Sequence, residues 1–127
     1  FGLPLGEAFQ LRDDLLGVFG DPEVTGKPAG DDLREGKRTV LIALTMEAAN
    51  KEVRDLLSAS LGDEGLDKTQ ILKLQEIISS SGAVAQVEKL ITELRDRAIS
   101  ALRDSQVEAS ILSVLEEMAT IATQRSL

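Results

Sequence analysis

The longest regular pattern in the sequence is a stripe of apolar residues that repeats every three or four positions. Charged and polar side chains stand between its members, so the apolar ones fall on one face of a helix. No segment alternates apolar and polar residues for long, and no Asn-Gly or Asp-Gly hairpin occurs, so strands are not expected. We therefore expect an all-α fold. The stripe consists of Val84, Val87, Leu90, Ile91, Leu94, Ala98, Ala101 and Leu102.

Other segments predict further helices, and several carry capping residues. Residues 5–19 are amphipathic, residues 39–49 are apolar on nearly every face and should be buried, and a last helix covers about 107–121. Residues 20–30, rich in Gly and Pro, predict a long loop with a functional role. Expected N-caps are Asn50, Asp67 with its partner Gln70, and Asp32 with its partner Glu35.

Composition excludes several classes of site. The 127 residues are enough for one domain, which we expect to be a single helical segment over 1–127. A net charge of -8 disfavours nucleic-acid binding, and the absence of Cys and His leaves only hard, oxygen-liganded metals. No apolar run is long enough for a membrane span, and the N-terminal residues do not resemble a signal peptide. We expect a cytoplasmic protein.

The polar face of the first expected helix carries Gln10, Asp13, Asp14 and two glycines, Gly6 and Gly17. A glycine inside a helix costs about 1 kcal/mol relative to Ala, which suggests that something approaches this backbone closely. One amide and two carboxylates around a groove without side chains suit a hydrated Mg²⁺ ion. The alternative is that the two aspartates are an ordinary exposed acidic pair.

Two lysines flank the glycine-rich segment that follows. Lys27 and Lys37 lie ten residues apart, next in the chain to the carboxylates. Lysines near a carboxylate-bound magnesium ion are what a diphosphate group needs for binding. The alternative is that both lysines only contribute to solubility at the surface.

Taken together, these residues resemble the second aspartate-rich region of the trans-isoprenyl diphosphate synthases. The resemblance is dense over the first 39 residues and looks closest to bacterial geranylgeranyl diphosphate synthases. It implies the C-terminal part of an isoprenoid-synthase helical bundle. The matching residues are Phe9-Gln10-Leu11-Arg12-Asp13-Asp14-Leu15-Leu16-Gly17, Gly20-Asp21, Gly26-Lys27, Gly30, Asp32-Leu33, Gly36-Lys37 and Thr39.

The resemblance implies a transferase that uses Mg²⁺ to condense an allylic diphosphate with isopentenyl diphosphate. Asp13 would be the direct magnesium ligand, with Asp14 as its supporting carboxylate, and Gln10 would contact the reacting diphosphate. Lys27 would bind the allylic diphosphate, assisted by Lys37. The family pattern is Asp-Asp-x-x-Asp, and here Gly17 stands at the last position. We expect that Gly17→Asp would improve the use of magnesium.

The resemblance also implies that the family's first aspartate-rich motif lies upstream of Phe1, so that this chain alone is inactive. Two alternatives remain: a non-catalytic subunit of a heteromeric synthase, and an acidic helical interaction module. Because the helices upstream would normally cover residues 5–19 and 39–49, we expect the isolated chain to bury those surfaces against a second copy. A homo-oligomer is therefore expected.

Overall fold

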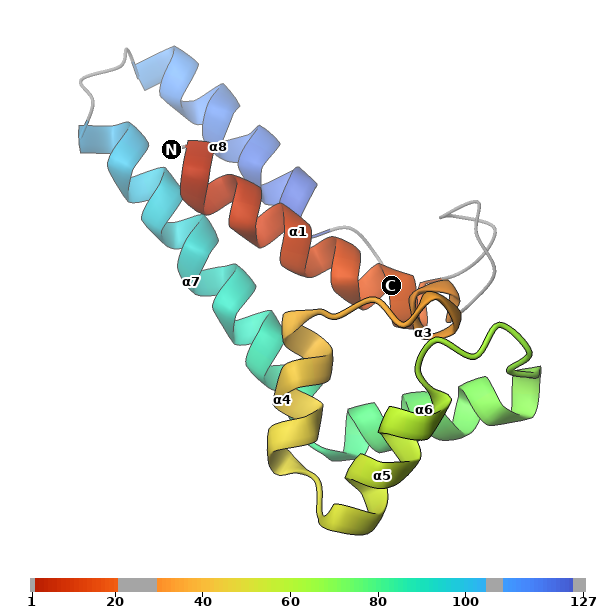
Figure 1. The fold of residues 1–127 in the computed structure, drawn as a ribbon. Coiled ribbons are helices and arrows are strands. Elements are labelled where there is room, and N and C mark those ends of the chain that lie inside the picture. Colours follow the sequence, from red (N-terminus) through yellow and green to blue (C-terminus); the bar gives the residue numbers. More distant parts are fainter. Residues whose placement is uncertain (1, 21–29, 105–108, 125–127) are drawn as a thin grey trace. The chain divides into compact units, whose positions relative to one another are not determined.

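The computed structural model describes residues 2–20, 30–104 and 109–124 of the chain. Within these ranges the regular structure is helical and contains no strand, which confirms the expected all-α fold (Figure 1). None of the helices described is long and apolar enough to cross a bilayer. The helices are α1 (Gly2–Phe19), α3 (Asp31–Glu35), α4 (Val40–Ala48), α5 (Lys51–Ser60), α6 (Lys68–Ser80), α7 (Ala83–Asp104) and α8 (Ala109–Thr123).

Local capping explains where the middle helices begin. The side chain of Asn50 accepts a hydrogen bond from the Val53 amide at 2.9 Å, so α5 begins at residue 51. Asp67 and Gln70 each accept from the other's amide at 2.8 Å, which is the reciprocal cap predicted for α6. Both predictions are confirmed. Thr39 caps α4 as Asn50 caps α5: its side chain accepts a hydrogen bond from the Ile42 amide at 3.2 Å.

The short helix α3 differs from the prediction. Its N-cap is Gly30, without a side-chain cap, and Asp32 lies buried inside the helix rather than capping it. Gly30 and Gly36 bracket α3 with φ angles of 75° and 70°, a left-handed conformation that favours glycine. A Cβ atom at Gly30 would lie 2.6 Å from Ile71 in α6, and one at Gly36 would lie 2.9 Å from the Cα atom of Gly62. These close approaches fix the place of α3.

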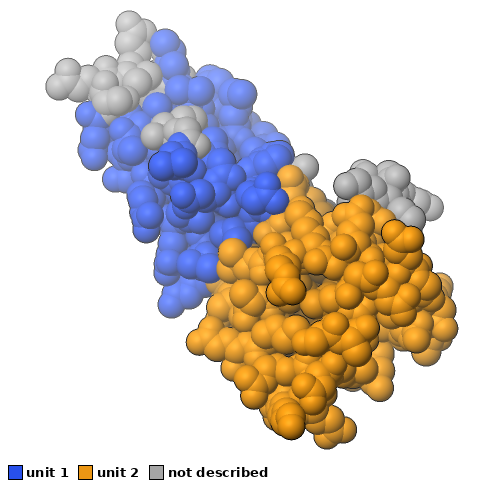
Figure 2. All heavy atoms as spheres, in the orientation of Figure 1, with its two compact units in different colours: residues 1–12, 88–126 blue, residues 13–87, 127 orange. Residues whose placement is uncertain are grey.

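The chain divides into two compact units, which Figure 2 shows in different colours. We call residues 13–87 with residue 127 the α4 unit, and residues 1–12 with residues 88–126 the α8 unit. The boundaries fall inside α1 and inside α7. The single domain over residues 1–127 stays a prediction.

The core of the α4 unit draws on each of its helices. Helix α4 contacts α5 and α6. The expected burial of residues 39–49 is confirmed only on the face of Leu41, Ile42 and Thr45, and is wrong for Val40, which is 43% exposed. The Gln75 side chain of α6 donates a hydrogen bond to the carbonyl of Val18 in α1 at 2.6 Å. This hydrogen bond and the burial of apolar side chains hold α1 against α6, and the candidate site lies on the same part of α1. Fully buried side chains here are Leu15, Leu33, Leu41, Thr45, Leu57, Ile78 and Val87, with Val18.

Among the described residues, α8 carries more exposed large apolar side chains than any other helix. The apolar face of α1 is covered in part within the chain: Ala8, Leu11, Leu15 and Val18 are buried, whereas Phe9 is 39% exposed. Burial of the rest against a second copy stays a prediction. Ile111, Val114, Met118 and Ile121 of α8 are 51% to 65% exposed and share one helical face.

Candidate functional site

Two of the predicted site residues come together in the α4 unit. The Lys37 ammonium lies 3.7 Å from Oδ1 of Asp14, and 3.9 Å from Oδ2 of Asp32. Both carboxylates are buried, whereas the Lys37 side chain is 44% exposed. Burying a carboxylate is costly unless a counter-charge lies close, and here one lysine serves two. Lys37 therefore lies within ion-pair distance of both buried carboxylates, and its own side chain is open to solvent.

Asp13 precedes this cluster in α1 and is more accessible than Asp14. Its side chain is partly exposed, while Asp14 is 4% exposed. Two adjacent carboxylates on one helix thus differ in exposure: Asp14 is buried beside Lys37, and Asp13 is partly open to solvent. This difference could not be read from an Asp-Asp dipeptide.

The remaining predicted residues are placed elsewhere. Gln10 is exposed on α1 and belongs to the α8 unit, whereas Asp13, Asp14 and Lys37 belong to the α4 unit. Lys27 lies outside the described residues, as does most of the predicted loop over 20–30.

The two glycines of α1 have different surroundings. At Gly6, an added Cβ would meet nothing within 4 Å among the described residues, so no part of the described chain approaches this glycine and the close approach stays a prediction there. At Gly17 it is confirmed, because an added Cβ would overlap all three atoms of the Asp32 carboxylate group, including Oδ1 at 2.8 Å. A side chain at residue 17 would therefore require the Asp32 side chain to move, and the expected benefit of Gly17→Asp for magnesium use stays a prediction.

Sequence reasoning missed Asp32 as a site residue. Asp32 forms a group with Asp31 and Glu35 in which the carboxylate oxygens lie within 4.8 Å of one another. From the sequence, Asp32 is predicted as a helix cap and as part of the matching motif, but it receives no role in the site. The available signal was its place between Gly30 and Gly36, which pack closely against Ile71 and Gly62, but the contact with Gly17 is not local in sequence.

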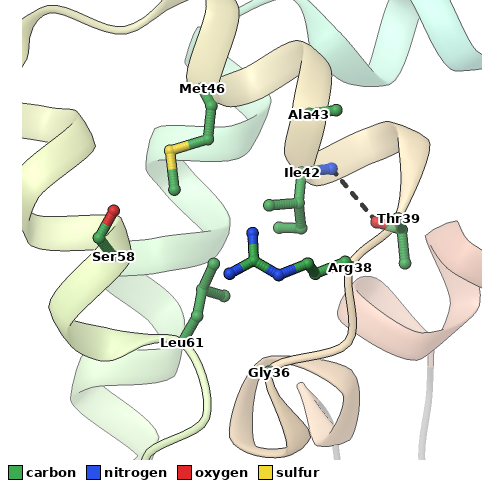
Figure 3. A pocket seen from close by; sticks show the side chains of 8 residues that line it. All are labelled: Gly36, Arg38, Thr39, Ile42, Ala43, Met46, Ser58 and Leu61. Atoms are coloured by element: carbon green, nitrogen blue, oxygen red, sulfur yellow. Dashed lines mark hydrogen bonds between the residues drawn. The ribbon is translucent and has the colours of Figure 1, made fainter.

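A pocket of about 500 Å³ lies between the start of α4 and the end of α5. Figure 3 shows the Arg38 side chain reaching into it, among apolar side chains from both helices. Arg38 follows Lys37 directly, so consecutive residues serve two places: Lys37 the carboxylate cluster, Arg38 this pocket. The other lining residues are Gly36, Thr39, Ile42, Ala43, Met46, Ser58 and Leu61.

Comparison with known proteins gives related synthases. The chain is 36% identical over 107 residues to a geranylgeranyl diphosphate synthase of Saccharolobus solfataricus, which covers 84% of this chain and 32% of that protein. It is 42% identical over 88 residues to a geranylfarnesyl diphosphate synthase of Aeropyrum pernix, which covers 68% of this chain and 26% of that protein. These relatives make differently named products, so they do not specify one product for this chain.

A solved structure is similar over nearly the whole chain. It is a geranylgeranyl pyrophosphate synthase from Corynebacterium glutamicum, complexed with isoprenyl diphosphate and magnesium, with 42% identity and a TM-score of 0.91. The similarity covers 97% of this chain and 35% of that one, so this chain spans about a third of its length. The family model described as polyprenyl synthetase matches residues 1–78, more than half of the chain. The chain therefore belongs to the polyprenyl synthetase family.

Proposed function

We propose that this chain supplies the diphosphate-binding wall of a prenyl diphosphate synthase, in which an allylic diphosphate is joined to isopentenyl diphosphate. The observation that carries the proposal is the cluster of Asp14, Lys37 and Asp32 beside the accessible Asp13. A cation between buried carboxylates, open to solvent, is arranged to meet a phosphate group without leaving its own site uncompensated. Family membership supports the same assignment.

In the proposed reaction the C–O bond of the allylic diphosphate breaks, and its electron pair leaves with inorganic diphosphate. The allylic carbon then forms a bond with the terminal alkene carbon of isopentenyl diphosphate, which loses a proton to restore a double bond. The work of the protein is to stabilise the negative charge that develops on the leaving group. Lys37 would bind that group, together with Lys27, and Gln10 would contact it.

The residues present fit a magnesium ion. Magnesium prefers carboxylate oxygens and keeps several waters, so one accessible aspartate together with substrate oxygens is a suitable set of ligands. Asp13 would hold the ion, because it is more accessible than Asp14. Asp14 would support the site by positioning Lys37, 3.7 Å away. Bound magnesium would neutralise charge on the departing diphosphate.

A chimeric enzyme tests the proposal. In the Corynebacterium glutamicum synthase, the matching 35% of the chain would be replaced by this chain, and elongation measured with an allylic diphosphate and labelled isopentenyl diphosphate. We expect magnesium-dependent elongation by the chimera and none by this chain alone.

The two alternatives predict other outcomes. A non-catalytic subunit would give a folded chimera without elongation, and a mere interaction module would give no binding of diphosphate, with or without magnesium, in a titration. Circular dichroism would first show that the chimera is folded. A folded chimera that does not elongate, or that does not bind diphosphate, would contradict the proposal.

A further inference from the structure

The pocket between the start of α4 and the end of α5 combines a cation with apolar walls. Among the described residues that line it, Arg38 alone is charged. The side chains of Ile42, Met46 and Leu61 lie around the Arg38 guanidinium in Figure 3. The volume of about 500 Å³ falls in the range of about 300–1,000 Å³ that small-molecule sites in proteins occupy. The pocket is therefore large enough for a small ligand.

Arg38 has no counter-ion in the described part of the chain. Within residues 2–20, 30–104 and 109–124, no hydrogen bond or ion pair joins its guanidinium to another side chain. Arg12, by contrast, is held by Glu88, and Lys37 lies beside two carboxylates. The Arg38 side chain is exposed, so a ligand can reach its N–H donors from solvent.

We propose that this pocket binds a small amphiphilic anion, whose head group pairs with Arg38 and whose hydrocarbon part lies against Ile42, Met46 and Leu61. A guanidinium presents its N–H donors in a planar fork, which matches two oxygens of a phosphate or carboxylate group. The Thr39 hydroxyl lines the same pocket. It accepts a hydrogen bond from the Ile42 amide at 3.2 Å and can donate its own hydrogen to the head group.

This site differs from the proposed diphosphate site. Asp14, Asp32 and Lys37 do not line the pocket. No carboxylate belongs to the described lining residues, so the head group would pair with Arg38 directly and without a metal ion. The inference therefore goes beyond the proposed function. Its test uses this chain alone in magnesium-free buffer, so a failure here leaves the chimera experiment undecided, and a failure of the chimera leaves this one undecided.

Isothermal titration of this chain with octyl phosphate tests the proposal, at concentrations below those at which the probe forms micelles. Octyl phosphate carries a phosphate head group and a hydrocarbon chain. We expect it to bind at least about tenfold more tightly than inorganic phosphate, because only the octyl chain removes apolar surface from water. Equal affinities for the two probes, or no binding of octyl phosphate, would overturn the proposal.

The role of the cation is tested with two arginine variants. Arg38→Gln should weaken the binding of octyl phosphate at least about tenfold, because it removes the charge-assisted hydrogen bonds to the head group. Arg54 is exposed on α5 and does not line the pocket. Arg54→Gln removes the same charge and should change the affinity less than about twofold, because salt screens a distant exposed charge. Equal losses would show that net charge alone governs binding.

The role of the pocket is tested by filling it from α5. Ser58 lines the pocket, whereas the next residue, Ala59, does not, and both side chains are exposed. Ser58→Phe should weaken the binding of octyl phosphate at least about tenfold, because the added ring takes up space that the hydrocarbon chain needs. Ala59→Phe adds a ring of the same size outside the pocket and should leave the affinity unchanged. The same effect from both variants would contradict the proposed site.

The unsubstituted chain offers a test that does not depend on the folding of any variant. In amide NMR spectra, octyl phosphate should shift the signals of residues 38–46 and 58–61 most strongly. Shifts centred on Asp14 and Lys37 would place the probe at the carboxylate cluster instead and overturn the proposal. Thermal unfolding would show that each variant is folded before it is titrated.

Discussion

Arg12 is clamped to Glu88 by two hydrogen bonds within the α8 unit. The guanidinium donates to Oε1 at 2.8 Å and to Oε2 at 2.7 Å, and its Nε atom donates to the carbonyl of Thr123 at 2.9 Å. One buried side chain thus joins α1, α7 and α8. Arg12 directly precedes Asp13, so the clamp fixes the helix turn that enters the candidate site.

Glu88→Gln should lower the free energy of unfolding by about 2 kcal/mol, because it leaves the buried Arg12 charge without its counter-ion. Urea denaturation of this chain measures the change.

The matched control is Glu116→Gln. Arg103 makes the same kind of contact with Glu116, at 2.7 Å, but its side chain is 62% exposed. The Glu116 carboxylate accepts a hydrogen bond from Arg103 and raises the pKa of its guanidinium. Arginine is charged at neutral pH with or without this shift, and water screens the exposed pair. Equal losses for both variants would show that burial of Arg12 does not matter.

Asp13→Ala should reduce turnover of the chimera at least about 100-fold, because the ion it is proposed to hold offsets charge on the departing diphosphate. Steady-state kinetics at saturating magnesium measures this, with Glu7→Ala, an exposed acid on the same helix, as the control. A loss below about tenfold, or about 1.4 kcal/mol, would remove Asp13 from the metal role.

Lys37→Ala should raise the KM for the allylic diphosphate more than tenfold, because it removes a charge-assisted contact to phosphate. It should also lower stability, because Asp14 and Asp32 stay buried after their shared cation is lost. Arg38→Ala is the matched control: it removes the same charge from the next residue, which lines the pocket instead. If the two variants changed the KM equally, net charge rather than the position of Lys37 would govern binding.

The isolated chain should self-associate through the exposed face of α8. Burying this apolar face between two copies would stabilise the dimer by about 25 cal/mol for each Å² removed from water. Met118→Asp with Ile121→Asp should shift the chain to a monomer in light scattering at micromolar concentration. Ser113→Asp and Glu117→Lys, exposed on the same helix, serve as controls for changed charge. A monomeric unsubstituted chain would contradict this prediction.

The sequence predicted those elements whose signals are local. The starts of α5 and α6 depend on bonds between residues three apart, Asn50 with Val53 and Asp67 with Gln70, and such spacing is visible in a sequence. The place of Asp32 is not local, because it depends on Gly30 and Gly36 packing α3 against Ile71 and Gly62. Asp32, which the sequence predicts as a helix cap, therefore lies inside α3 instead.

The site was predicted in part for the same reason. The Asp-Asp pair and the lysines could be singled out by residue type, and the structure brings Asp14 and Lys37 together. That Asp14 is paired while Asp13 is accessible depends on which side of α1 meets α3. The role of Arg12 is not predicted from the sequence, because a single arginine beside two aspartates gives no sign that Glu88, 76 positions later, will meet it.

Gly30 and Gly36 limit which sequences can keep α3 in this place. Both have left-handed φ angles, and a Cβ atom would press on Ile71 at Gly30 and on the Cα atom of Gly62 at Gly36. A single change at either glycine would therefore be strained twice, by its own backbone angle and by its neighbour. Because no side-chain hydrogen bond caps α3, changes between the two glycines leave its place intact only while both glycines stay.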